Sequence, residues 1–201
     1  MLVATPLAWW LARDRRWWAT CAESIIALPL VLPPTVLGFY LLVLLGPQGL
    51  VGQFWEGMGG PRLVFSFWGL VIGSMLFSLP FVVQPIQQAF RIIDERYLEV
   101  AATLRARPID RFFTVALPLA RRGLVSAATL GFAHTLGEFG VVLMIGGSIP
   151  GRTKVISIAI YDAVESSNYP LAHQMSALML VASFLLLFTV YWMNRRPTRQ
   201  P

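Results

Sequence analysis

The chain has 201 residues, of which 56% are hydrophobic and only 13% are charged, with a formal net charge of +6 and a mean hydropathy of +0.65. Soluble domains usually carry about 25% charged residues, so this composition argues against a soluble fold. A basic balance points to nucleic acid only in a soluble domain. The single cysteine, Cys21, excludes an internal disulfide and a cysteine-based zinc cluster.

Long uncharged runs predict an all-α, polytopic membrane protein. A membrane-spanning helix needs about 20 consecutive apolar residues. Asp, Glu, Lys and Arg are absent from residues 24–55, 63–90, 123–137 and 166–194. We therefore expect a single transmembrane domain over residues 1–201, with four full spans at about 24–45, 66–89, 123–146 and 172–193.

Residues 1–12 form an apolar stretch that is too short to cross a membrane. As a helix it would reach about 18 Å, whereas the hydrocarbon core is about 30 Å thick. The positive charges of Arg13, Arg15 and Arg16 follow the stretch, whereas a secretory signal peptide carries its positive charge first. We expect 1–12 to be the truncated remainder of a first span.

The distribution of Lys and Arg predicts which loops face the cytoplasm. Thirteen of the 16 basic residues lie before the 24–45 span, between the 66–89 and 123–146 spans, or after the last span, where Arg195, Arg196 and Arg199 stand. The loops at about 46–62 and 147–170 hold the other three and are rich in Gly, Pro and Ser. Because cytoplasmic loops carry the excess of positive charge, we expect the C-terminus inside.

Prolines interrupt two of the expected spans. Pro29, Pro33 and Pro34 lie in the 24–45 span, and Pro80 and Pro85 lie in the 66–89 span. Proline kinks a helix, and a bilayer tolerates such breaks where they face protein or a wet cavity. Transporters line their pathways with broken helices, although helix packing alone also explains a proline. The candidate pathway residues here are Pro33, Pro34, Thr35, Ser78 and Pro80.

Glu138 is the only acidic residue inside an expected span, and an intramembrane carboxylate is a functional hypothesis by default. On a continuous helix, His134 would lie one turn earlier on the same face, next to Thr135. Two ligands do not fill a tetrahedral shell, so no metal site is expected. A proton relay and a hydrogen-bonded structural carboxyl both stay open. His134, Thr135 and Glu138 join the pathway candidates.

Residues 91–121, RIIDERYLEVAATLRARPIDRFFTVALPLAR, are too charged to span and predict a helical hairpin. We expect two short helices around Ala106, Arg107 and Pro108. Their apolar faces would be Leu98, Ala101, Ala102 and Leu104 on the first, and Phe112, Phe113, Val115 and Leu117 on the second, which Pro118 ends. Such a hairpin suits a soluble partner, and a hairpin lying on lipid headgroups is the alternative.

This hairpin resembles the signature loop of ABC importer permeases. That loop carries a Glu, two Ala, a Gly and an aliphatic-x-Leu-Pro ending, which Glu99, Ala101, Ala102, Val115, Leu117 and Pro118 match. Arg105 stands where the family has its glycine, and the preceding stretch is one residue short. The resemblance implies a MetI-like permease fold. It also implies that the loop docks on a separate ATPase subunit through Glu99, Ala101, Ala102, Arg105, Ala106, Pro108, Leu117 and Pro118.

Further motifs resemble the molybdate permeases within that family. They are LPLVLPPTVLGFYLLVLLG at 28–46, FFTVALPLA at 112–120 and GFAHTLGEFGVVLMIGGSIPGRTKVISIAIYD at 131–162. The run LGEFG at 136–140 is shared with sulfate permeases, and members often carry Arg where His134 stands. The resemblance implies a homodimer in a bacterial inner membrane, an ATPase subunit that holds the ATP, and a periplasmic oxyanion-binding protein. The cargo would be molybdate or tungstate.

The chain has no Gly-rich loop with a lysine that would cradle phosphates, so we expect neither an enzyme nor a bound cofactor. Membrane lipid is expected around it, and nucleic acid is not expected as a partner. Three alternatives stay open: a sulfate or thiosulfate permease, a proton-coupled secondary transporter that uses His134 and Glu138, and a membrane assembly protein that transports nothing.

Overall fold

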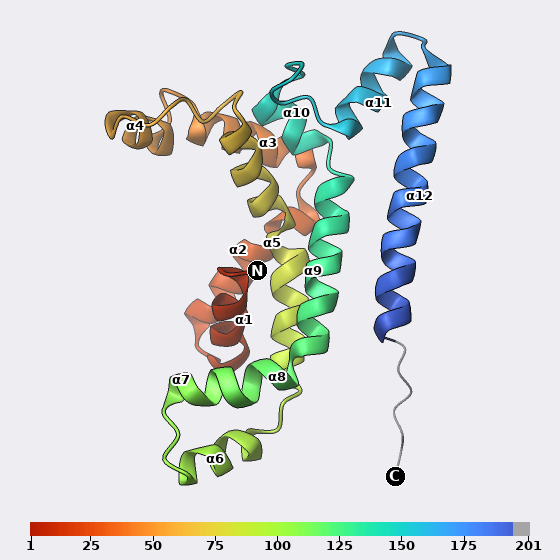
Figure 1. Ribbon diagram of the computed structural model, residues 1–201. Coiled ribbons are helices and arrows are strands. Elements are labelled where there is room, and N and C mark those ends of the chain that lie inside the picture. Colours follow the sequence, from red (N-terminus) through yellow and green to blue (C-terminus); the bar gives the residue numbers. More distant parts are fainter. Residues whose placement is uncertain (195–201) are drawn as a thin grey trace. The chain divides into compact units, whose positions relative to one another are not determined.

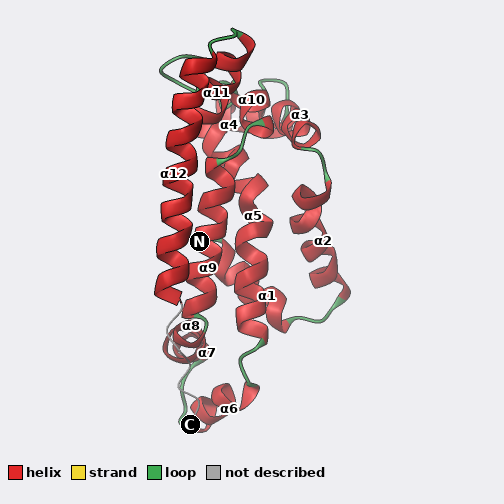
Figure 2. Cartoon of the chain, turned by 90° about the vertical axis from the view of Figure 1, so that its right-hand side faces the viewer, coloured by secondary structure: helices red, strands yellow, loops and turns green. Residues whose placement is uncertain are grey.

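The structure is a computed structural model that describes residues 1–194, with side chains as far as Trp192. Every regular element in these residues is helical, which confirms the all-α class (Figure 2). Arg195, Arg196 and Arg199, which we expected after the last span, lie outside the described residues. Figure 1 labels the elements in chain order: α1 (Ala4–Arg13), α2 (Trp17–Val31), α3 (Pro34–Leu45), α4 (Leu50–Gly57), α5 (Phe67–Arg91), α6 (Glu95–Thr103), α7 (Pro108–Arg111), the π-helical segment η1 (Phe112–Ala116), α8 (Leu117–Leu119), α9 (Arg121–Leu136), α10 (Gly140–Gly146), α11 (Ile156–Glu165) and α12 (Tyr169–Asn194).

The chain divides into two compact units. Among the described residues, unit 1 consists of Met1–Ala27, Leu79–Phe132 and the segment from Val190 on, and unit 2 consists of Leu28–Ser78 and Ala133–Thr189. The helices α2, α5, α9 and α12 each contribute residues to both units. Each unit has its own buried core, so the two are described separately.

The core of unit 1 is built around α1 and the second half of α5. Ala4, Ala8 and Leu11 are spaced by three or four residues and therefore share one face of α1. They belong to a buried cluster with Val83, Ile86, Phe90, Leu98, Ala116, Ala120 and Ala127. Alanine is frequent in this cluster because small residues let helices approach closely, and close packing holds helices together in lipid.

The core of unit 2 is built around the contact between α3 and α10. Leu41 and Leu45 of α3 are buried with Val141 and Ile145 of α10. The two helices approach closely at Gly38, where an added Cβ would lie 2.8 Å from Cβ of Met144. A second buried cluster, Leu70, Val142 and Ile158, packs α10 against α5 and α11.

Two long helices coincide with expected spans. α5 extends over the expected span at 66–89, and α12 extends over the one at 172–193. Pro80 and Pro85 lie inside α5 without ending it. α1 covers most of the partial span at 1–12. By length and hydropathy, α5, α12 and the stretch Pro34–Gly57 could each cross a membrane.

The expected span at 24–45 is not one continuous helix. α2 ends at Val31, and α3 begins at Pro34 after Pro33, which has an extended backbone with ψ 138°. Neither proline can donate the backbone hydrogen bond that would continue α2, and a proline also disfavours helical backbone in the residue before it. The apolar stretch that is long enough to cross a membrane is therefore Pro34–Gly57, which contains α3 and α4, rather than residues 24–45.

The expected span at 123–146 is also broken. α9 ends at Leu136 and α10 begins at Gly140, with a bend of 60° between them. The two regions expected to be outer loops contain helices, α4 in residues 46–62 and α11 in residues 147–170. The helical breaks thus fall inside apolar segments, and short helices occupy the Gly- and Pro-rich connections.

Candidate functional site

The predicted hairpin is present in unit 1 and consists of α6 followed by a second arm of α7, η1 and α8 (Figure 1). The side chain of Asp94 caps α6 by accepting a hydrogen bond of 3.0 Å from the backbone N–H of Arg96. Leu98 is buried and holds α6 on the core of unit 1. A capped helix anchored through one buried leucine leaves most of its other side chains exposed.

α6 ends in a left-handed turn at Arg105, whose φ is +60°. The backbone N–H of Arg105 donates to the carbonyl of Ala102 at 2.9 Å, and that of Ala106 donates to the carbonyl of Ala101 at 3.1 Å. These two bonds make a Schellman motif, in which the left-handed residue is usually glycine. The resemblance led us to expect a glycine at this position, and Arg105 adopts the left-handed conformation without being a glycine.

The second arm begins at Pro108, the first residue of α7, where the missing N–H of proline is harmless. We expected this helix to end at Pro118, and it ends one residue later, at Leu119. Upstream of Pro118 the helix widens into η1, and the N–H of Leu117 donates to the carbonyl of Phe112. Since Pro118 lacks a donor and its ring crowds the carbonyl four residues earlier, the wider turn relieves the clash.

The hairpin offers partners a surface of mixed character. Glu99, Ala102 and Arg105 are exposed, whereas Ala101, Ala106 and Leu117 are partly buried. Leu104 and Phe113, which were predicted to lie on the apolar faces of the two helices, have exposed fractions of 78% and 59%. The exposed apolar side chains lie beside arginines, so the hairpin carries both apolar and cationic contact groups.

Unit 2 gathers several of the polar residues predicted for a pathway. Ser78 is buried on α5, and its hydroxyl oxygen lies 2.8 Å from that of Thr135 on α9. His134 packs its ring edge-on against Phe77, with 4.9 Å between the ring centroids. The structure therefore brings Ser78, His134 and Thr135 together where α5 meets the end of α9.

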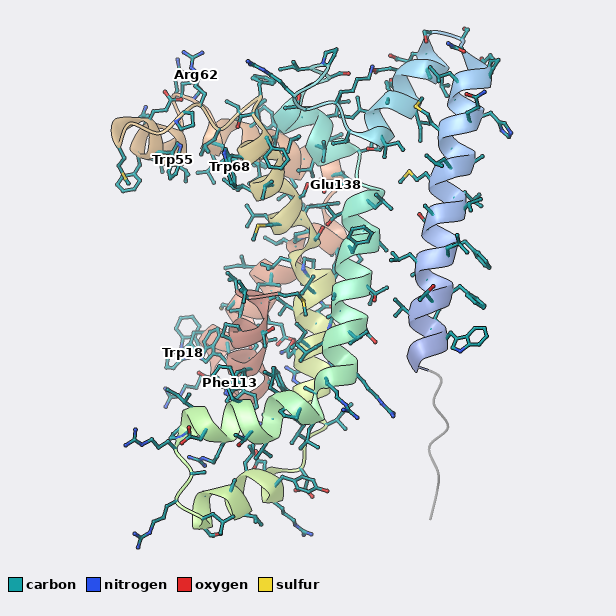
Figure 3. The ribbon with its side chains drawn as sticks, viewed as in Figure 1. Trp18, Trp55, Arg62, Trp68, Phe113 and Glu138 are labelled. Carbon is teal, nitrogen blue, oxygen red and sulfur yellow. The ribbon has the colours of Figure 1, made fainter. Side chains whose placement is uncertain are left out.

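Glu138 lies in the break between α9 and α10 (Figure 3), with only 4% of its surface exposed. Its expected place one turn after His134 on a continuous helix is wrong, because α9 ends at Leu136. Its backbone carbonyl accepts a hydrogen bond of 2.5 Å from the hydroxyl of Ser157 on α11. Neither ion pair among the described residues includes Glu138, and Ser74 of α5 is a polar neighbour of its carboxyl.

The two helix breaks meet in unit 2. A Cβ added at Gly140, the first residue of α10, would lie 2.7 Å from Cβ of Pro34, the first residue of α3. Pro33 and Thr35 flank that contact and are exposed. Pro80, on the same helix as Ser78, is fully buried and is assigned to unit 1. Of the predicted pathway residues, those on α3 and those near Glu138 thus share one neighbourhood.

A second polar group lies in the connection between α10 and α12. The ammonium of Lys154 lies 2.6 Å from the carboxylate of Asp162, and the hydroxyl of Ser148 donates to the same oxygen at 2.8 Å. These hydrogen bonds, that from Lys154 first, hold the pKa of Asp162 below its ordinary value. The group fastens the turn at residues 149–153 to α11.

Some residues at these sites escaped the sequence analysis. Ser74 lies one helical turn before Ser78, and that spacing was a usable signal. Ser157 gave no signal, because a serine in a Gly- and Ser-rich connection is unremarkable until its partner is known. The packing of Phe112 against Trp9, whose ring centroids are 5.2 Å apart, joins segments about a hundred residues apart and has no local signature.

Comparisons with known proteins agree with this architecture. A family model described as the inner membrane component of binding-protein-dependent transport systems matches residues 4–199. The molybdenum transport system permease protein ModB of Azotobacter vinelandii is 56% identical over 97% of this chain and 86% of its own length. ModB of Haemophilus influenzae is 34% identical over 98% of this chain and 88% of its own.

Two further comparisons extend the likeness. The sulfate transport system permease protein CysT of Salmonella typhimurium is 33% identical over 94% of this chain and 68% of its own length. A chain from a solved bacterial alginate ABC transporter, in complex with a periplasmic protein that holds an alginate pentasaccharide, superposes with a TM-score of 0.75. That superposition covers 98% of this chain and 72% of the other at 18% identity, so it shows the fold alone.

Proposed function

Because this chain belongs to the family of inner membrane components of binding-protein-dependent transport systems, we propose that it is the permease subunit of an ATP-driven importer of molybdate or tungstate. The assignment of the cargo rests on the 56% identity to a molybdenum permease over 97% of this chain. Molybdate and tungstate are proposed together because both are tetrahedral dianions of similar size. The chain performs no bond chemistry and holds no cofactor of its own.

The hairpin is the surface through which the partner ATPase drives transport. Glu99, Ala102 and Arg105 are exposed and can enter a groove on that subunit, and ATP is bound and hydrolysed there. Ala101 and Ala106 fix the turn through their Schellman hydrogen bond, while Pro108, Leu117 and Pro118 shape the second arm. Closure of the ATPase pair moves the hairpin, and the spans follow.

Two copies of the chain form the pathway between them, in an inner membrane with the C-terminus cytoplasmic. A periplasmic binding protein delivers the oxyanion to the opposite mouth. The pathway candidates are Pro33, Pro34, Thr35, Ser78, Pro80, His134, Thr135 and Glu138. An ionised Glu138 would repel a dianion, so hydroxyl groups and backbone N–H groups at the helix breaks are the contacts offered to the cargo.

Sulfate is the second candidate cargo, and one observation favours it. The sulfate permease CysT of Salmonella typhimurium matches 94% of this chain at 33% identity. Sulfate and molybdate carry the same charge and shape, so a shared permease architecture with a selective binding protein explains both likenesses.

Reconstitution of the complete complex tests the proposal. The chain is co-expressed with the ATPase and the binding protein of its transporter, and uptake of labelled molybdate into proteoliposomes is measured with and without a hundredfold excess of sulfate. We expect uptake that needs ATP, persists in a protonophore and resists sulfate. Loss of uptake in the presence of the protonophore at constant ATP would establish proton coupling instead. Suppression of molybdate uptake by excess sulfate would identify sulfate as the cargo.

A charge reversal tests the docking surface. Glu99→Arg should abolish co-purification of the ATPase, because it replaces an exposed carboxylate on α6 with a cation. Glu165→Arg is the matched control, since it makes the same reversal at an exposed carboxylate of α11, which is not part of the hairpin. If both variants retain the ATPase equally, α6 is not part of the interface with the ATPase.

A further inference from the structure

Three aromatic rings connect the hairpin to two other helices of unit 1. Phe112, on the second arm, lies 5.2 Å from Trp9 of α1 and 6.0 Å from Phe90 of α5, measured between ring centroids. Trp9 and Phe90 are themselves 5.0 Å apart, with their planes at 79°. Each ring therefore touches the other two, and the three form what is called the aromatic cluster below.

The aromatic cluster is packed rather than loose. Only 1% of Phe90 is exposed, and Trp9 and Phe112 pack against the same buried core. The guanidinium of Arg13 lies 4.2 Å from the centroid of Trp9 and covers that ring. Protein interiors have crystal-like density, so one ring cannot shift without moving its neighbours or opening a void. A displacement of Phe112 is thus passed to Trp9 and Phe90.

Phe112 lies where the second arm changes from α-helix to π-helix. It is the first residue of η1, and its carbonyl accepts the N–H of Leu117. The next residue, Phe113, touches the ring of Phe112 at 5.0 Å but is 59% exposed and contributes to no buried core (Figure 3). Of these two adjacent phenylalanines, Phe112 is partly buried and contacts α1 and α5, whereas Phe113 is exposed and contacts the ring of Phe112.

We infer that Phe112 is a positioning residue of the transport cycle, which passes the displacement of the hairpin to α1 and α5 through Trp9 and Phe90. The inference rests on the proposed function, because it needs an ATPase that moves the hairpin. The backbone joins the hairpin to α5 and α9 at its two ends, but it does not join the hairpin to α1. Side-chain contact is therefore the route by which the first helix follows the motor, and the aromatic cluster supplies it.

The test compares Phe112→Leu with Phe113→Leu in the complete reconstituted complex, with its ATPase and binding protein. The measured quantity is the amount of molybdate taken up per ATP hydrolysed. We expect Phe112→Leu to lower this ratio about threefold or more, within the range by which mutations along packed routes change coupling between sites. Phe113→Leu should leave the ratio unchanged. Phe112→Tyr, which keeps the ring, should restore most of it.

Each outcome decides the matter. A fall in uptake and hydrolysis in the same proportion in Phe112→Leu would assign Phe112 to stability or docking and overturn the inference, as would an equal loss of the ratio in Phe113→Leu. If Phe112→Leu does not assemble, Trp9→Leu removes the same ring contact from the other side and must lower the ratio. A wild-type complex without ATP-dependent uptake would refute the proposed function itself, whereas a coupled wild type with an unchanged Phe112→Leu ratio refutes this inference alone.

Discussion

Replacing Arg105 by glycine should stabilise the turn of the hairpin. Arg105 has a φ of +60°, and a non-glycine residue pays roughly 1–2 kcal/mol in that left-handed region. Glycine avoids this strain but loses more conformational freedom on folding, which costs about 0.5–1 kcal/mol. The difference leaves a net gain of about 0.5–1 kcal/mol for Arg105→Gly.

Hydrogen exchange measures this gain where it arises. The amide of Ala106 donates to the carbonyl of Ala101 and exchanges only when the turn opens. A gain of that size should raise its protection factor about two- to fivefold, because about 1.4 kcal/mol corresponds to a tenfold change in an equilibrium constant. The measurement is made on the full complex by mass spectrometry.

Arg107→Gly is the matched control for this prediction. It removes the same charge two residues later, at a position with an ordinary φ of −66°. Glycine relieves no strain there and only adds freedom to the unfolded chain, so protection should fall. If both variants lower protection, the left-handed turn is not strained and the reasoning from φ is wrong.

Three other changes probe unit 2. Ser157→Ala removes the 2.5 Å hydrogen bond to the carbonyl in the α9–α10 break and should lower the free energy of unfolding by about 1 kcal/mol, as read from thermal unfolding in detergent; an unchanged midpoint would contradict it. Gly38→Val drives a side chain into Met144 and should cost about 1–3 kcal/mol in the same assay, with Gly38→Ala losing less; equal stability of all three proteins would refute close contact. The pKa of Asp162 is lowered in the folded state by Lys154, so its stabilisation is complete above the ordinary pKa of an aspartate and is lost as the pH falls through the lowered value. Asp162→Asn should abolish that loss in hydrogen exchange of α11, and equal acid sensitivity in both proteins would exclude the pair as its cause.

The long spans were predictable because hydropathy records them directly. The uncharged run before Arg91 and the run that ends near Trp192 became α5 and α12. Hydropathy reports apolar character but not continuity, so it could not locate the two breaks. At 32–33 the signal existed in the Pro33-Pro34 pair, whereas the break at 137–139 contains no proline and depends on tertiary contacts such as that between Gly140 and Pro34.

The hairpin was predictable in outline and less so in detail. Two helical arms joined by a turn were predicted from the charge of the segment, the spacing of its apolar residues and Pro108. The resemblance marked Arg105 as the position where the family has a glycine. An arginine by itself does not predict a left-handed backbone, because only the neighbouring carbonyls of α6 determine the Schellman geometry. The polar site was predictable only in part. A hydroxyl and a carboxyl inside apolar segments identified Ser78 and Glu138 as candidates, but the residues that they contact depend on the fold.

The π-helical turn at 112–116 also affects how this arm must be aligned with other chains. The turn that a hydrogen bond from residue i to residue i−5 closes contains one more residue than an α-helical turn. The second arm therefore has one residue more than a regular α-helix of the same length. One residue rotates a helix by about 100°, and a helical wheel drawn through the turn assigns wrong faces beyond it. A relative that lacks the surplus residue would present the same faces only if it were aligned with a gap at this turn.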